Sequence, residues 1–108
     1  MSNEIVKVRV RFVKHRREII AIIRDVWDGE KARWIKDVKY NPCHRCDVAI
    51  CYAHSGQHFE AEYAWTKQLR PASPEEFRPL LNELTSIGYD VTVLNRAWYH
   101  TNRKGVLS

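Results

Sequence analysis

No apolar run in this chain of 108 residues approaches the roughly 18 residues that a membrane-spanning helix requires. The first residues also lack the apolar core of a secretory signal, because an alternating charged pattern begins near residue 5. Sequence repeats and low-complexity segments are missing as well. We therefore expect a cytoplasmic protein without membrane contact, folded as a single domain over residues 1–108.

Acidic residues are scarce in the first part of the chain. Residues 1–45 hold 12 Lys and Arg but only 6 Asp and Glu, whereas residues 46–108 hold 6 and 7. The net charge of +5 therefore originates in the N-terminal part. Such an asymmetry favours an anionic partner, although a solvated basic face has the same composition.

Two strand hairpins are predicted before any helix. Residues 5–13 alternate between apolar and charged side chains, as in a strand with one buried face. Residues 19–23 are apolar throughout, as in a strand inside a sheet, and complete the first hairpin. Residues 27–46 show no sustained period, so we interpret them as a long ordered excursion. Residues 47–65 predict a second hairpin, whose turn contains Gly56.

One helix and a last strand follow. Ser73 is a hydroxyl N-cap, followed by a proline and then, at Glu76, by the glutamate of a capping box. Apolar residues at helical spacing lead to Gly88, which ends the helix, and residues 89–94 predict a strand. The order ββββαβ indicates an α+β fold, with a mostly antiparallel sheet of about five strands and one helix packed on one face. We expect the other face to remain open.

The expected register of the second hairpin sorts its side chains onto two faces. Pairing His54 with His58 buries the face that carries Cys51. The open face then holds Tyr52, His54, His58, Glu60 and Glu62. These imidazoles and carboxylates could bind a divalent ion or move a proton near neutral pH, although a polar solvent-exposed face has the same composition. No nucleophile or phosphate-binding loop accompanies them, so we favour a protein without enzymatic activity.

The three cysteines offer a metal site as an alternative. Cys43-x2-Cys46, followed by Cys51 and His54, supplies the sulfur and nitrogen ligands of a closed zinc site. The expected register argues against it, because Cys51 and His54 point to opposite faces. Free thiols, with Cys51 as a small buried side chain, and a dithiol redox pair at Cys43 and Cys46 are the other interpretations. We therefore expect no cofactor, with zinc as the alternative.

Basic and aromatic residues of the N-terminal part form a candidate anion-binding set. Lys7 and Arg9 lie at alternate positions of the first predicted strand, about 6.6 to 6.8 Å apart, close to the phosphate spacing of an extended nucleic acid. The full set is Lys7, Arg9, Arg11, Lys14, Arg16, Arg17, Trp27 and Trp34. Charges that protect a strand edge from pairing would show the same pattern. The basic and aromatic tail, residues 96–108, suits nucleic-acid contact or a frayed terminus packed through Trp98.

A composite motif occupies the stretch from Cys51 to Tyr89. It reads Cys51-Tyr52-Ala53-His54-x-Gly56-Gln57-His58, then Pro71-Ala72-x-Pro74-Glu75-Glu76-Phe77, then Leu81-x-Glu83-Leu84-x-x-Ile87-Gly88. It resembles a group of small uncharacterised proteins carried by phages, plasmids and conjugative elements. The resemblance implies a genomic setting rather than an activity, and it favours a candidate site at Cys51, His54, Gly56, Gln57, His58 and Glu60. Cys43, Cys46 and the basic strand lie outside the motif.

These observations lead to one functional expectation and one alternative. We expect a non-enzymatic accessory protein of a mobile genetic element that binds a host or element macromolecule through its basic N-terminal hairpin. The macromolecule is a protein, such as a component of a defence system, or a nucleic acid. The alternative is a small zinc-stabilised module that binds nucleic acid.

Overall fold

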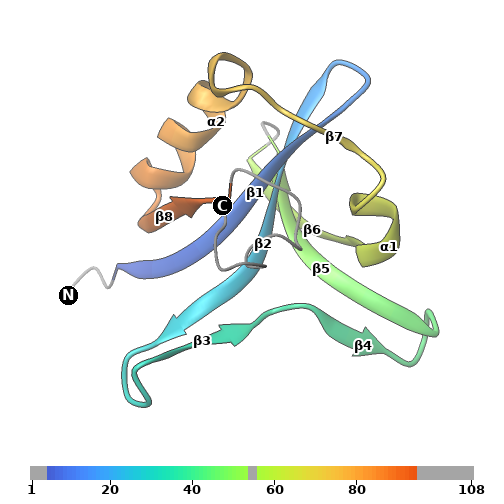
Figure 1. Ribbon diagram of the computed structural model, residues 1–108, viewed down its shortest axis with the longest axis vertical. Coiled ribbons are helices and arrows are strands. Elements are labelled where there is room, and N and C mark those ends of the chain that lie inside the picture. Colours follow the sequence, from blue (N-terminus) through green and yellow to red (C-terminus); the bar gives the residue numbers. More distant parts are fainter. Residues whose placement is uncertain (1–4, 54–55, 95–108) are drawn as a thin grey trace, which may run out of the picture.

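The predicted strands and helix assemble into one curved sheet with a helix on each side, α2 beside β8 and α1 beside β6 in Figure 1. This computed structural model describes residues 5–53 and 56–94. In chain order, the elements are β1 (Val6–His15), β2 (Glu18–Asp28), β3 (Arg33–Lys36), β4 (Lys39–Asn41), β5 (Cys46–Ala53), β6 (Gln57–Glu62), α1 (Tyr63–Thr66), β7 (Arg70–Pro71), α2 (Pro74–Ser86) and β8 (Tyr89–Val93). The α+β class is confirmed, with a mostly antiparallel sheet and one long helix packed against it.

The long strand β2 lies at the centre of the sheet. It pairs antiparallel with β1 along one edge and with β3 and β5 along the other. Strand β5 also pairs with β4 and β6, and β1 pairs on its outer edge with β7 and, in parallel, with β8. Because β1 is paired along both edges, its charges do not protect an open strand edge.

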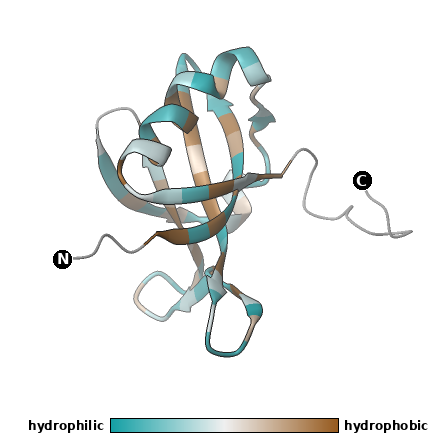
Figure 2. Cartoon of the chain, turned by 90° about the vertical axis from the view of Figure 1, so that its left-hand side faces the viewer, coloured by the Kyte–Doolittle hydropathy of each residue, from teal (hydrophilic) through white to brown (hydrophobic). Residues whose placement is uncertain are grey.

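Each face of the sheet is buried by a different segment. On one face, Leu80 and Leu84 of α2 pack against Val8 and Val10, and the Phe12 ring stacks on another α2 residue, Phe77, at a centroid distance of 4.4 Å. Figure 2 looks onto α2, a helix of mixed hydrophilic and hydrophobic residues, with strands rich in hydrophobic residues behind it. The other face is covered by Val38 and by the segment that leads from β6 through α1. Both sides of the sheet therefore contribute a hydrophobic core.

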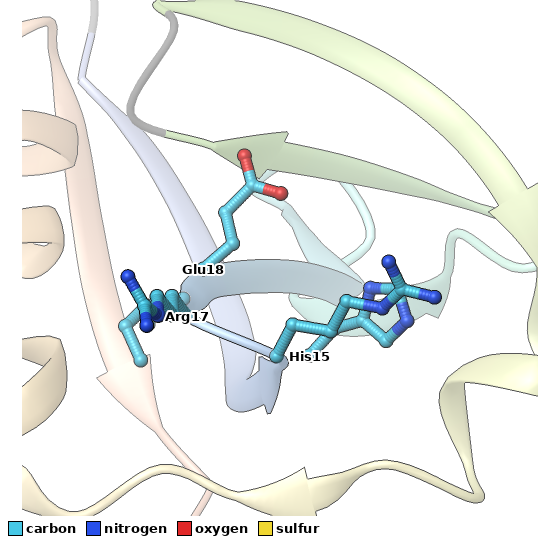
Figure 3. Close-up of a pocket in the computed structure, with 5 residues that line it drawn as sticks. His15, Arg17 and Glu18 are labelled. Atoms are coloured by element: carbon cyan, nitrogen blue, oxygen red, sulfur yellow. The ribbon is translucent and has the colours of Figure 1, made fainter.

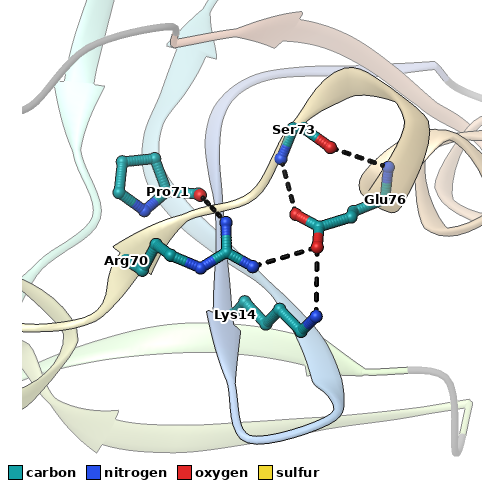
Figure 4. Close-up of polar contacts among 5 residues, drawn as sticks. All are labelled: Lys14, Arg70, Pro71, Ser73 and Glu76. Atoms are coloured by element: carbon teal, nitrogen blue, oxygen red, sulfur yellow. Dashed lines mark hydrogen bonds and ion pairs between the residues drawn. The ribbon is translucent and has the colours of Figure 1, made fainter.

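The start of α2 is held by a capping box and two cations. The Ser73 hydroxyl accepts a hydrogen bond from the Glu76 amide, and the Glu76 carboxylate accepts one from the Ser73 amide. The same carboxylate contacts Lys14 at 3.0 Å and Arg70 at 2.9 Å (Figure 4). The predicted helix start is confirmed, and the cations tie it to β1 and β7.

The stretch 27–46, expected to be an excursion, belongs largely to the sheet. Strand β2 continues to Asp28, and β3 and β4 add short strands beside β2 and β5. Trp27 and Trp34 lie directly opposite each other in the β2–β3 pair. The sequence did not reveal these strands because segments of four and three residues are too short to show a period.

The second hairpin differs from its prediction in three ways. His58 lies opposite Tyr52 rather than opposite His54, a shift by two residues that leaves the assignment of faces unchanged; His54 itself is outside the described residues. The strand ends at Glu62, where the chain turns into α1 and folds back over the sheet. The face predicted to be open is covered at Tyr52, which is only 3% exposed because α2 packs over it.

Candidate functional site

A β-bulge in β2 determines which side chains share a face with the basic residues of β1. Between Arg9 and Val10 the β1–β2 register shifts, and Arg24 becomes the extra residue of β2. Without it, the regular ladder would continue and direct Trp27 to the side covered by α2. The bulge instead places Trp27 on the opposite side of the sheet, together with Lys7 and Arg9.

Four residues of the predicted anion-binding set meet on that side. The Lys7 ammonium lies over the Trp27 ring, 5.6 Å from its centroid, and the Arg9 guanidinium lies over the Trp34 ring at 4.3 Å. The two indole rings contact each other edge to face at a centroid distance of 5.3 Å. Lys7 is exposed and the other three are half-buried. We call these four residues, Lys7, Arg9, Trp27 and Trp34, the basic–aromatic face.

A buried carboxylate orients the guanidinium groups next to this face. Asp25 is 7% exposed and lies opposite Arg9 in the sheet. One of its oxygens accepts hydrogen bonds from Arg24, at 3.2 and 3.1 Å, and contacts Arg9 at 3.5 Å. Charge-assisted contacts of this kind restrict the guanidinium groups to a narrow range of positions. Asp25 therefore positions Arg9 over Trp34 while leaving the local charge positive.

The other predicted cations do not extend the basic–aromatic face. Arg11, expected to be exposed, is 4% exposed, because α1 covers this part of β1, and it donates a hydrogen bond to the Thr66 carbonyl. Lys14 pairs with Glu76. Arg16 and Arg17 are exposed in the β1–β2 turn. Figure 3 shows that the side chains of His15 and Arg17 leave this turn toward opposite sides. The predicted row of eight residues is therefore reduced to four that cluster.

Residues from separate parts of the composite motif meet on the α2 side. The Tyr52 hydroxyl donates a hydrogen bond of 2.6 Å to Glu83 of α2, and this bond, together with burial, raises the pKa of Tyr52. His58 Nε2 lies 2.9 Å from the Tyr89 hydroxyl, and the His58 ring contacts Tyr52 edge to face at 4.9 Å. These contacts connect β5, β6, α2 and β8. These motif residues therefore have a structural role, in which their contacts tie one element to another.

The remaining motif residues have local roles or lie at the surface. Gly56 has φ +84°, a conformation that side-chain-bearing residues rarely adopt, and so permits the turn before β6. Gln57 and Glu60 are exposed. Cys51 is completely buried in the core beneath α1. The predicted site at Cys51, His58 and Glu60 is thus divided between two faces.

The geometry of β5 argues against the four-ligand zinc site, whose fourth residue, His54, lies outside the described residues. Cys46 and Cys51 are five residues apart in β5, so their Cα atoms are separated by about 16 Å, whereas zinc–sulfur bonds are about 2.3 Å long. Burial raises the pKa of the Cys51 thiol to about 12. Over residues 5–53 and 56–94, no group of three or more His, Cys, Asp and Glu side chains is arranged to hold a metal ion.

The dithiol interpretation is also weakened by the structure. Cys43 lies in the turn before β5 and Cys46 is the first residue of that strand, so the motif does not open a helix. Burial and the carboxylates of Glu62 and Asp47 raise the pKa of Cys46. A raised pKa lowers the fraction of reactive thiolate.

Sequence reasoning named the members of the basic–aromatic face but not their assembly. It missed Asp25, because a single acidic residue among apolar neighbours does not reveal which cations it will contact. The one available signal was the change of pattern after residue 23, where the apolar run gives way to Arg24 and Asp25 before Val26. Such a break is consistent with a bulge, but it does not specify one.

Comparison with family models, curated proteins and solved structures finds no match to this chain. In the part of the chain that the structure describes, no helix has the length and apolar character needed to cross a membrane. Function must therefore be inferred from the chemistry of the described surface.

Proposed function

We propose that this chain is a non-enzymatic accessory protein of a mobile genetic element that binds an anionic macromolecule through the basic–aromatic face. The observation that carries the proposal is the meeting of Lys7, Arg9, Trp27 and Trp34, contributed by three neighbouring strands. The mobile-element setting rests on the motif resemblance alone. The binding activity rests on the chemistry of the surface.

Cations held over aromatic rings suit this role. The rings favour the ammonium and guanidinium groups electrostatically while leaving their outer sides available to an anionic ligand. The excess of basic residues in the first 45 positions adds a long-range attraction for a polyanion. Both features support binding rather than chemistry, since neither supplies a nucleophile or a general base.

The competing functions receive less support from the geometry. A zinc-stabilised module requires ligands that the rigid strand β5 holds apart. An enzyme built on His58 and Glu60 would require those groups to face a reacting atom, yet His58 contacts Tyr89 and Tyr52 in ties between elements. The side chains of the basic–aromatic face are not used in these contacts between elements, so they are better placed to bind a partner.

The proposal is tested with the charge reversal Lys7→Glu. Affinities for nucleic acids and for polyglutamate are measured at about 50 and about 200 mM salt. We expect binding to at least one polyanion, weakened several-fold or more by Lys7→Glu and weakened by salt. The matched control is Arg78→Glu, an exposed cation of α2 on the other side of the sheet. Equal effects of the two reversals, or no binding at tens of micromolar, would contradict the proposal.

A further inference from the structure

Contacts between cations and aromatic rings continue beyond the basic–aromatic face. The Lys36 ammonium lies over the Tyr63 ring, 5.9 Å from its centroid, and the Lys67 ammonium lies 5.2 Å from the same centroid. Both lysines are exposed, while Tyr63 is half-buried. The sequence did not indicate this group, because its members come from β3, from α1 and from the residue that follows α1.

The two groups adjoin through β3. Trp34 and Lys36 occupy alternate positions of this strand, so they point to the same side of the sheet about 7 Å apart. Lys36 also lies opposite Asp25 in the β2–β3 pair, and Asp25 is the carboxylate that holds Arg9. A continuous series of aromatic rings and cations therefore leads from the two tryptophans over Lys36 and Tyr63 to Lys67.

The charges around Tyr63 are mixed but favour an anion. The positive charges of Arg11 and Arg24 interact with Tyr63. The negative charges of Asp25 and Asp47 interact with it as well. Asp25 is already engaged with Arg9 and Arg24. With Lys36 and Lys67 added, cations outnumber carboxylates around this ring.

Building on the proposed function, we infer that the ligand is a single-stranded nucleic acid and that it runs from the basic–aromatic face over Tyr63, between Lys36 and Lys67. Aromatic rings alternating with cations match a strand whose bases are free to stack while its phosphates contact lysine and arginine. A duplex offers no free base faces to the rings. An acidic polypeptide would use the cations but would gain nothing specific from the indoles.

The proposed path of the strand, from the basic–aromatic face over Tyr63, is tested with the double variant Lys36→Ala/Lys67→Ala. Its control is Arg17→Ala/Arg78→Ala, which removes the same charge from the hairpin turn and from the outer surface of α2. Binding of oligothymidylates of about 4, 8 and 12 nucleotides is followed by tryptophan fluorescence over a range of salt concentrations. Because each phosphate contact on a single strand contributes about 0.7 to the slope of log K against log salt, we expect the test variant to lower the slope by about 1.4. We expect the control variant to keep the wild-type slope.

The outcomes separate the inference from the proposed function. An unchanged salt slope in Lys36→Ala/Lys67→Ala, with Lys7→Glu still weakening binding, overturns the path and leaves the proposed function standing. Tighter binding of a duplex than of either of its separated strands, or binding of polyglutamate without binding of oligonucleotides, overturns the single-stranded ligand only. Failure to bind any of these polymers overturns both. Preference for single strands, combined with the reduced slope, supports the inference.

Discussion

Glu76 joins the start of α2 to β1 and β7 through its contacts with Ser73, Lys14 and Arg70. Hydrogen bonds from Arg70, from the Ser73 amide and from Lys14 lower the pKa of its carboxyl from 4.5 to about 2. A carboxyl whose pKa is lower in the folded than in the unfolded protein stabilises the fold above its unfolded pKa. That stabilisation is lost as the pH falls from about 4.5 through about 2.

Glu76→Gln tests this ionic contribution, because glutamine preserves the capping box but not the charge. We expect the variant to be less stable than the wild type at pH 7 and to lose less stability on acidification to pH 3. Chemical denaturation at both pH values measures the effect. The control is Glu75→Gln, which changes an exposed neighbour in the same helical turn. A Glu76→Gln variant as stable as the wild type at pH 7 would show that the ion pairs contribute nothing.

Among the elements, helix α2 buries two leucines completely against the sheet. Leu80 and Leu84 are completely buried and pack against the apolar side of β1. We expect Leu84→Ala to lower the free energy of unfolding by about 2 to 5 kcal/mol, because it removes buried surface and leaves a cavity. Urea denaturation measures this loss.

The control for this prediction is Ile87→Ala, since Ile87 directly follows α2 and is 51% exposed. Its effect should be clearly smaller than that of Leu84→Ala. Comparable losses in the two variants would mean that α2 is not attached through its buried leucines.

Elements with strong local signals could be predicted from the sequence. The first hairpin, the start of α2 at Ser73 and its end near Gly88 all follow from alternation, capping and glycine chemistry, and all are confirmed. The bulge at Arg24, the short helix α1 and strands β3 and β4 could not be predicted. Their positions depend on which distant segments they contact, and short segments show no periodicity.

At the scale of the whole molecule, the two sides of the sheet have different chemistry. The α2 side is closed by the Tyr52–Glu83 and His58–Tyr89 contacts, whereas the α1 side carries the basic–aromatic face. Sequence reasoning could name the four members of that face from their types. It could not show that they meet, because their meeting depends on the bulge and on the pairing of β2 with β3.

Tyr89→Phe tests whether the motif residues act as ties. The variant retains the ring and removes the hydroxyl that contacts His58, so we expect stability to fall by about 0.5 to 1.5 kcal/mol and affinity for polyanions to stay unchanged. The control, Tyr40→Phe, removes an exposed hydroxyl from β4, and we expect no change in either property. Lost binding with unchanged stability in Tyr89→Phe would instead place the binding site on the α2 side.

We propose that the α1 side of the sheet binds an anionic macromolecule through the basic–aromatic face. The most direct measurement is an NMR titration of the labelled protein with a single-stranded oligonucleotide, following backbone amides and indole N–H groups. We predict that the largest shifts occur at the indoles of Trp27 and Trp34 and at the amides of β1 and β3. Shifts concentrated on α2 and β8, with both indole signals unchanged, would show that the ligand binds elsewhere than on the basic–aromatic face.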